Sequence, residues 1–420
     1  MNDGRANGTC ESTSSEMREA RMGESTGRRE RRRITVVGGG FGGLTAALCA
    51  AETGAQVTVH EAREELGGRA RTALGPHRTN EGPHVLYDGG PHWRWLRERK
   101  LLPPMARVPA AEGLRMRFHH DGALHRMPPL GLLRLRRTRD APMDVPYLEW
   151  AAERAGEATA RAAAHFAAVA TFHHAPGELS AAFTHERMRR ASKLPPEAHY
   201  VRGGWGSLVA RMAERARERG VRIETGSRVG PGALAEAREH GPVVVATSLA
   251  AARGLLDDPT LSWPSGRTAL LDLVLETRTG DPFVVSDLDA PGWIERFTAA
   301  DPSLAPAGQA LIQAQFPLAP EEKRGDALAR GDHLLDLAFA GWRERVVRRT
   351  EATANGRTGA VDLPGTCWRD RPAVDRGDGC YLVGDQVAAP GVLSEVSFAS
   401  ALEAVRLALG TPRARGAGVG

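Results

Sequence analysis

The stretch Ile34-Thr35-Val36-Val37-Gly38-Gly39-Gly40-Phe41-Gly42-Gly43 decides the fold. Its first four residues predict a buried strand, and the glycines after them have the spacing G-x-G-x-x-G. Leu44 to about Thr53 then predicts a helix. In this pattern Gly38 allows a tight turn, Gly40 lets the backbone approach a diphosphate, and Gly43 lets the helix pack closely on the strand. Phosphates would meet the free N–H groups at the start of that helix.

An acidic residue follows at the distance that a dinucleotide fold needs. Gln56 to His60 predicts a second strand, and Glu61 comes directly after it. We expect the Glu61 carboxylate to accept hydrogen bonds from both ribose hydroxyls and to repel a 2′-phosphate. A glycine turn alone is a weak signal, because such turns are common in loops. Strand, turn, helix, strand and acid in this order favour dinucleotide binding over an incidental turn.

A second glycine turn bears on which dinucleotide is bound. After Glu61 the chain continues Ala62-Arg63-Glu64-Glu65-Leu66-Gly67-Gly68-Arg69, where a simple nicotinamide-binding domain would continue into another helix and strand. This loop can wrap the other side of a diphosphate, with Arg69 as its charge partner. With the first turn, it resembles the FAD-binding segment of the flavin amine oxidase and phytoene desaturase superfamily.

The resemblance returns near the C-terminus. Cys380-Tyr381-Leu382-Val383-Gly384-Asp385 is similar to the closing strand of that superfamily, which implies that Asp385 faces the ribityl and phosphate region of the flavin. Pro390-Gly391-Val392-Leu393-Ser394-Glu395 then opens a helix to about Leu409, and its start would point at the flavin pyrimidine edge. Backbone N–H groups there would stabilise the negative charge of a reduced flavin. FAD is therefore expected rather than NAD.

The predicted fold class is α/β, with a discontinuous Rossmann-like FAD-binding domain and an inserted substrate domain made of a mixed sheet plus helices. The FAD-binding pieces are 34–95, 200–262 and 365–410, and the substrate pieces are 96–199 and 263–364. Residues 1–33 are expected to be a disordered tail and 411–420 a flexible one. The residues expected to bind FAD are Gly38, Gly40, Phe41, Gly42, Gly43, Glu61, Ala62, Arg63, Gly68, Arg69, Val229, Gly384, Asp385, Val392 and Leu393.

Periodicity predicts the remaining elements. By resemblance, Val229 meets the adenine through its backbone, although a plain core valine stays open as an interpretation. In the FAD-binding pieces we expect a helix over 207–219 and strands over 221–225 and 242–247. In the inserted domain we expect a hairpin over 114–127, one long helix over 147–172, strands over 268–276, 283–286, 309–316 and 333–338, and a helix over 341–350.

No catalytic residue is assigned, because a flavin itself performs the hydride or electron transfer. His84 is the best single candidate for an acid–base group, against the simpler interpretation of a histidine bonded to backbone. Many amine oxidases of the superfamily place a lysine on a substrate-domain strand, and the strand 268–276 has none. Lys323 lies in a charged stretch typical of an exposed turn or a helix start. A polar-amine oxidase is therefore disfavoured.

No metal site is predicted. His92 and the pairs His119-His120 and His173-His174 are expected to lack the carboxylate or cysteine partners that a metal needs. The cysteines are scattered without C-x-x-C spacing and predict neither a disulfide framework nor a metal site. They are Cys10, Cys49, Cys367 and Cys380.

Composition sets the broad class. With 41% hydrophobic residues, 25% charged residues and a net charge of +5, the chain resembles an ordinary globular protein. A nucleic-acid partner is disfavoured, because no basic stripe is interleaved with aromatic residues. The sequence shows neither a secretion signal nor a membrane-spanning apolar run, so a cytoplasmic location is expected. The cluster from Arg28 to Arg33 leaves two interpretations open: contact with acidic lipid, or plain solvation.

The resemblance implies an FAD-dependent oxidoreductase. The segments 80–87 and 384–401 are most similar to phytoene-desaturase-type bacterial flavoproteins, which implies dehydrogenation or saturation of a carbon–carbon bond in a hydrophobic, secondary-metabolite-like molecule. An amine or alcohol oxidase, and a non-redox flavoprotein such as an isomerase or a scaffold in a biosynthetic complex, stay open. So do the electron acceptor and the oligomeric state. The apolar side chains expected to line the pocket, or else to form the second core, are Met116, Phe118, Met127, Phe166, Phe172 and Phe183.

Overall fold

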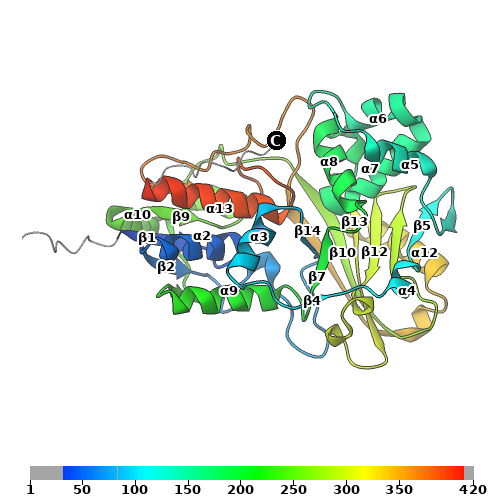
Figure 1. Cartoon of the computed structure of the whole chain (residues 1–420), viewed down its shortest axis with the longest axis horizontal. Coiled ribbons are helices and arrows are strands. Elements are labelled where there is room, and N and C mark those ends of the chain that lie inside the picture. Colours follow the sequence, from blue (N-terminus) through cyan, green and yellow to red (C-terminus); the bar gives the residue numbers. More distant parts are fainter. Residues whose placement is uncertain (1–31, 83, 411–420) are drawn as a thin grey trace, which may run out of the picture.

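The chain contains two large β-sheets, each with its own helices (Figure 1). The computed structural model describes residues 32–82 and 84–410. Of the predicted tails, only Arg32 and Arg33 fall within these ranges, and the rest of 1–33 and 411–420 lies outside them. The predicted boundaries of the two domains stay predictions.

The first sheet is parallel throughout, with the order β15-β9-β1-β2-β8. Its central strands are buried on both faces, which matches their continuous apolar runs. The sheet draws on three distant parts of the chain, which confirms the predicted Rossmann-like architecture. The strands are β1 (Arg33–Val37), β2 (Gln56–His60), β8 (Arg222–Glu224), β9 (Val243–Val245) and β15 (Cys380–Leu382).

Helix α2 (Phe41–Glu52) follows the glycine turn and begins at Phe41, earlier than the predicted Leu44. Leu44 and Leu48 are fully buried in the core of this part of the molecule. In Figure 1, α2 lies between α13 (Ser394–Leu409) and α9 (Gly206–Glu218), and it contacts both. The N-terminal glycine turn and the C-terminal helix are thus packed side by side.

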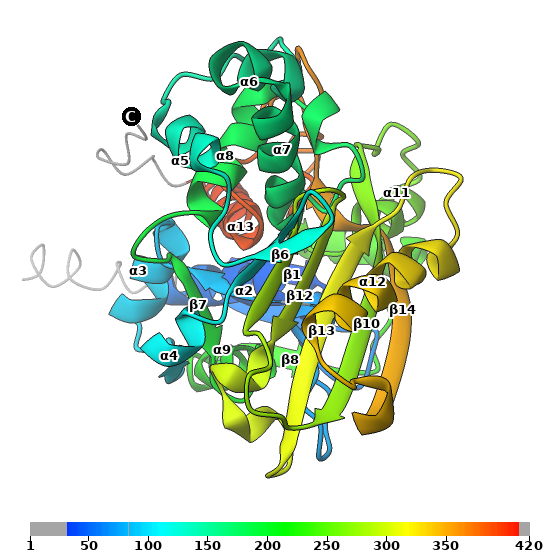
Figure 2. The same ribbon diagram turned by 90° about the vertical axis from the view of Figure 1, so that its right-hand side faces the viewer.

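The second sheet is mixed, with the order β14-β10-β13-β12-β11-β5-β6, and only β11 and β5 run parallel. Helix α12 (Arg324–Ala338) covers one face, where Leu335 packs with Phe316. A group of helices at the top of Figure 2 contacts the sheet through α7 (Glu157–Thr171). The strands are β5 (Arg117–His120), β6 (Ala123–His125), β10 (Ser265–Glu276), β11 (Val284–Asp287), β12 (Gly292–Arg296), β13 (Gln309–Pro317) and β14 (Val346–Ala360).

A small antiparallel sheet, β3-β7-β4, connects the two halves. Tyr200 of β7 packs against Phe283 and Phe297, next to the second sheet. These strands are β3 (Leu86–Tyr87), β4 (Met105–Ala106) and β7 (Ala198–Val201). The remaining helices are α3 (Pro91–Glu98), α4 (Ala110–Gly113), α5 (Leu130–Arg137), α6 (Tyr147–Ala155), α8 (Ala181–Ala191), α10 (Pro231–His240) and α11 (Leu249–Leu256).

Three predicted elements were wrong. The single helix over 147–172 is two helices, because Gly156 adopts a φ of +80° between α6 and α7. The strand over 333–338 is the end of α12, which buries Leu334 and Leu335 on one helical face. The helix over 341–350 is a short 3₁₀ turn at Arg343–Arg345 followed by β14. Pairing with β10 holds β14 in place although most of its side chains are exposed.

Candidate functional site

The first glycine turn leaves no room for a side chain at Gly38 or Gly43. A Cβ on Gly43 would lie 1.9 Å from the carbonyl oxygen of Gly38, and one on Gly38, whose φ is +111°, would lie 2.5 Å from that of Ala246. Among the described residues, no side chain caps the start of α2 at Gly40. The first-turn N–H groups of α2 are therefore left for a ligand, which is the arrangement that binds a diphosphate.

Glu61 is buried at the end of β2 and is held by two backbone donors. Its Oε2 accepts from the N–H of Gly39 at 2.8 Å, and its Oε1 accepts from the N–H of Arg63 at 3.0 Å. A carboxylate has about four acceptor positions, so two remain for ribose hydroxyls. Ser227, whose N–H donates to the carbonyl oxygen of Glu61 at 2.8 Å, lines the same cavity, as does Val229, the residue expected to meet the adenine.

The second glycine turn is tied to both the first turn and the C-terminal segment. Gly67, with φ +113°, donates its N–H to the carbonyl of Gly39 at 2.9 Å. Arg69 forms an ion pair with Asp385 and donates to the carbonyl oxygen of Arg357 at 2.8 Å. The predicted charge partner of the diphosphate is thus already paired with the residue expected to face the ribityl chain.

These segments enclose a cavity of about 850 Å³ whose wall comes from both large sheets. Most of the residues predicted to bind FAD line it, and two do not. Gly43 packs against Gly38, and Val392 is buried with its N–H donated to Glu395 Oε2 at 3.0 Å. The predicted residues that line the cavity are Gly38, Gly40, Phe41, Gly42, Glu61, Ala62, Arg63, Gly68, Arg69, Val229, Gly384, Asp385 and Leu393.

The second sheet and its neighbours contribute both apolar and polar side chains to the wall. Thr268 and Leu270 of β10 contribute to it, as the inward side of the predicted strand should. Of the six apolar residues predicted to line the pocket or form the second core, Phe172 is in the wall. Phe118 and Phe166 belong to the second core, and Met127 is 66% exposed.

His84 lies in the same wall, half-buried and edge-on to Trp205. Its Nδ1 is 2.9 Å from the carbonyl oxygen of Gly82, so Nδ1 carries the proton and Nε2 is left as an acceptor. Burial lowers the pKa of His84, although the bond to Gly82 opposes that shift. Near neutral pH the ring is therefore uncharged.

Sequence reasoning missed Glu295 and Tyr87, which also line the cavity. Glu295 is 4% exposed on β12, a strand that the sequence analysis did not predict. For Glu295 the available signal was an acid directly after the apolar pair Trp293-Ile294, which follows Ala290-Pro291-Gly292.

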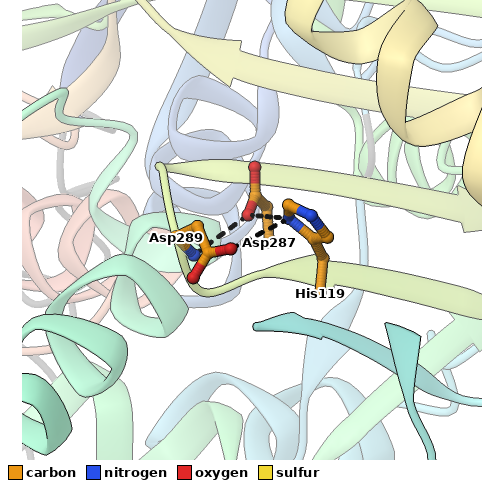
Figure 3. A group of neighbouring side chains, drawn as sticks. All are labelled: His119, Asp287 and Asp289. Atoms are coloured by element: carbon orange, nitrogen blue, oxygen red, sulfur yellow. Dashed lines mark hydrogen bonds and ion pairs between the residues drawn. The ribbon is translucent and has the colours of Figure 1, made fainter. Parts of the chain in front are cut away.

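The expectation that His119 and His120 lack carboxylate neighbours was wrong. Figure 3 shows His119 beside Asp287 and Asp289, with Nδ1 2.8 Å from Asp287 Oδ1 and 3.7 Å from Asp289 Oδ2. Backbone N–H groups of Asp121 and Gly122 already donate to Asp289, at 3.0 and 2.9 Å. This geometry stabilises the β5–β6 turn, and the absence of a metal stays a prediction. None of these residues lines the cavity.

Two further expectations from the sequence concern the described residues. Cys49, Cys367 and Cys380 are free thiols, and Cys10 lies outside the described ranges. No helix in the described ranges is both long and apolar enough to cross a membrane.

The sheet order, the glycine turns and the cavity define a dinucleotide-binding protein with a Rossmann-like domain. A family profile for NAD(P)-binding Rossmann-like domains matches residues 36–102. Over 60 residues the chain is 45% identical to carotenoid 3,4-desaturase from Haloarcula japonica. That match covers 14% of this chain, and the chain spans about a tenth of the length of the desaturase, 11%.

Solved structures agree over most of the chain. An oxidoreductase from Methanosarcina mazei has a TM-score of 0.69 at 17% identity, covering 88% of this chain and 99% of that protein. Cyclohexylamine oxidase from Brevibacterium oxydans has a TM-score of 0.64 at 15% identity, covering 90% and 98%. At these identities the likeness shows the fold. The predicted resemblance is supported in sequence by the match to the carotenoid desaturase and in fold by the amine oxidase structure.

Proposed function

We propose that the chain is an FAD-dependent oxidoreductase that dehydrogenates or saturates a carbon–carbon bond in a hydrophobic small molecule. The observation that carries this proposal is one cavity whose wall is shared by two glycine turns, the C-terminal segment and the second sheet with its neighbours, where Leu270, Ala354 and Phe172 add apolar surface. Bound FAD would supply the hydride chemistry. The residues that line the cavity extend from Glu61, at the end of β2 in the first sheet, to Leu270 on β10 of the second sheet.

The residues divide the work of binding. The backbone at Gly38 and Gly40, with the start of α2, would hold the diphosphate. Glu61 would accept from the adenosine ribose, Arg69 would face the diphosphate, and its partner Asp385 would hold the ribityl side. The sheet wall at Thr268 and Leu270 would exclude water from the bond that reacts and would bind an apolar substrate.

The match to a carotenoid desaturase supports a hydrophobic substrate, because its identity of 45% over 60 residues is far higher than that of the structural matches. It covers 14% of this chain, so it supports a class of substrate and not a particular reaction. The fold shared with cyclohexylamine oxidase keeps a hydrophobic amine as the second candidate substrate.

The test begins with the purified protein. We expect flavin absorbance, and thermal stabilisation by added FAD but not by NAD; ligand at a hundred times its Kd stabilises by about 2.7 kcal/mol. The FAD-loaded protein is then mixed anaerobically with a panel of polyene hydrocarbons and hydrophobic amines, and bleaching of the flavin is followed. Bleaching by polyenes is the expected result. If FAD does not stabilise the protein, the cofactor assignment is wrong. If only amines bleach the flavin, the reaction is amine oxidation and not carbon–carbon dehydrogenation.

A further inference from the structure

Glu295 is a buried carboxyl group in the cavity wall, and its two oxygens are held by two separate donors. The Tyr200 hydroxyl donates to Oε1, and the Trp293 indole Nε1 donates to Oε2 at 2.9 Å. Glu295 and Trp293 stand two positions apart on β12, so both side chains project from the same face of the sheet. The carboxyl group therefore has a set orientation at the cavity, with acceptor positions left over.

No cation among the described residues forms an ion pair with Glu295. The adjacent Arg296 pairs with Glu112 and donates to the carbonyl of Pro282. Arg190 lies over the ring of Tyr87, 5.3 Å from its centre, and its charge is paired with Glu395 and Glu197. Buried carboxylates usually have a positive partner, so an unpaired one in a cavity wall calls for a chemical reason.

The proposed reaction supplies that reason, because dehydrogenation of a CH–CH unit removes a hydride and a proton. We propose that Glu295 is the acid–base residue of this enzyme: its carboxylate takes the proton from the substrate carbon next to the one that gives up the hydride. The electron pair of the broken C–H bond becomes the second bond of the C=C, and the hydride passes to FAD as oxidant. Saturation is the same step in reverse, with the carboxylic acid as proton donor. This inference rests on the proposed function.

The surroundings of Glu295 suit that role. Burial raises the pKa of Glu295, while the hydrogen bonds from Tyr200 and Trp293 limit the shift. A base works best when its pKa lies near the working pH. The titratable groups that face it are Tyr200 on β7 and Tyr87 on β3; burial raises the pKa of Tyr87 to about 12, so it stays neutral. His84, on the same wall, has a pKa lowered by burial, and its Nδ1 is held by the carbonyl oxygen of Gly82.

The kinetic test compares three variants of the FAD-loaded protein, using the polyene from the panel that bleaches the flavin. Glu295→Gln keeps the size and the hydrogen-bonding shape, and should slow bleaching by about a hundredfold or more. Asp272→Asn is the matched control, since Asp272 is another acid on the second sheet whose pKa is raised by burial but which does not line the cavity. Reduction by dithionite should be equally fast in all. If His84→Asn abolishes bleaching while Glu295→Gln stays within about threefold of wild type, the proposal is overturned.

A second measurement needs no substrate and so separates this proposal from the proposed function. Infrared difference spectra of the FAD-loaded protein, recorded while the pH is varied, should contain a carboxylic acid C=O band that Glu295→Gln removes and Asp272→Asn leaves. Tyr200→Phe deletes a hydrogen bond to the ionised form, so it should move the titration of that band to higher pH. If no titrating band depends on Glu295, the residue holds no exchangeable proton and the proposal fails, whatever the panel shows. If the panel bleaches nothing while this band behaves as expected, the redox assignment fails, although Glu295 still holds an exchangeable proton at the cavity.

Discussion

Arg69 and Asp385, which are 316 positions apart in the chain, form an ion pair in the wall of the nucleotide cavity. Arg69 belongs to the second glycine turn, Asp385 follows β15, and the guanidinium also donates to the carbonyl of Arg357 on β14. Three distant segments therefore meet at one cation. The pair orients the Arg69 side chain before any ligand binds, which lowers the entropic cost of binding.

Breaking this pair should weaken FAD binding. We expect Arg69→Ala and Asp385→Ala each to raise the Kd for FAD by about tenfold, measured by quenching of flavin fluorescence. Because the two side chains act as a unit, the double variant should be little worse than either single one. Arg71→Ala is the control, since Arg71 is not in the cavity wall. Fully additive losses in the double variant would show that the two residues bind FAD independently.

The first glycine turn should tolerate no side chain at Gly43. In Gly43→Ala the new Cβ would overlap the Gly38 carbonyl, so the turn must open; we expect a loss of roughly 3 kcal/mol or more in the free energy of unfolding, together with loss of FAD binding. Gly325→Ala is the matched control. Gly325 lies in α12, a Cβ there would have nothing within 4 Å, and the substitution should be neutral or stabilise by up to about 1 kcal/mol. Urea unfolding measures both, and equal effects would contradict the close approach.

The nucleotide-binding part could be predicted because its signals are local. The strand at Gln56–His60 was predicted at its observed bounds, since apolar alternation and flanking turns coincide there. The inserted part was harder for physical reasons. The run His333–Ala338 is too short to separate a strand from a helical face, and β14 owes its conformation to β10 rather than to its own side chains. The break at Gly156 was hidden in an alanine-rich run.

In the site too, residues with local sequence signals were predictable and residues that depend on distant contacts were not. The glycine turns were predictable, because Gly38 with its positive φ and Gly43 with its close approach to Gly38 have backbone roles that only glycine fills. Glu295 was not, because nothing near it in the sequence shows that Tyr200 and Trp293 will be its partners; that contact exists only once β7 and β12 come together. Met127 was expected in the pocket wall or the second core, but it is exposed. Its apolar character alone did not predict its burial.

His92 should make the protein sensitive to acid. Its ring is fully buried next to Phe398, and neither ring nitrogen has a hydrogen-bond partner among the described residues. Burial lowers the pKa of His92 from 6.5 to about 4, against the opposing charge of Glu395. Between these pH values the unfolded chain takes up a proton that the folded protein does not. Stability is therefore full above about pH 6.5 and falls by roughly 3 kcal/mol as the pH drops towards 4.

The variant His92→Phe keeps the shape of the ring and removes the titration. In urea unfolding at several pH values, its stability should depend less on pH by roughly 3 kcal/mol across this window. His125→Phe, at an exposed position, is the control and should keep the wild-type dependence. An unchanged pH dependence in His92→Phe would mean that other groups account for the acid sensitivity.

We expect Arg190 of α8 to hold the inserted helices against α13, at the end of the cavity where the flavin would bind. Its guanidinium contacts Glu395 on α13 at 2.7 and 2.8 Å and Glu197 at 2.8 Å, and Glu395 in turn accepts the N–H of Val392. Glu395 is 3% exposed, so Arg190→Met leaves a buried carboxylate without its partner. We expect a loss of about 3–5 kcal/mol in the free energy of unfolding and weaker FAD binding, because the segment before α13 loses its anchor. Arg189→Met, one position away and exposed, should change stability by less than about 0.5 kcal/mol. If the two variants unfold alike and bind FAD alike, the buried pair does not hold this end of the cavity together.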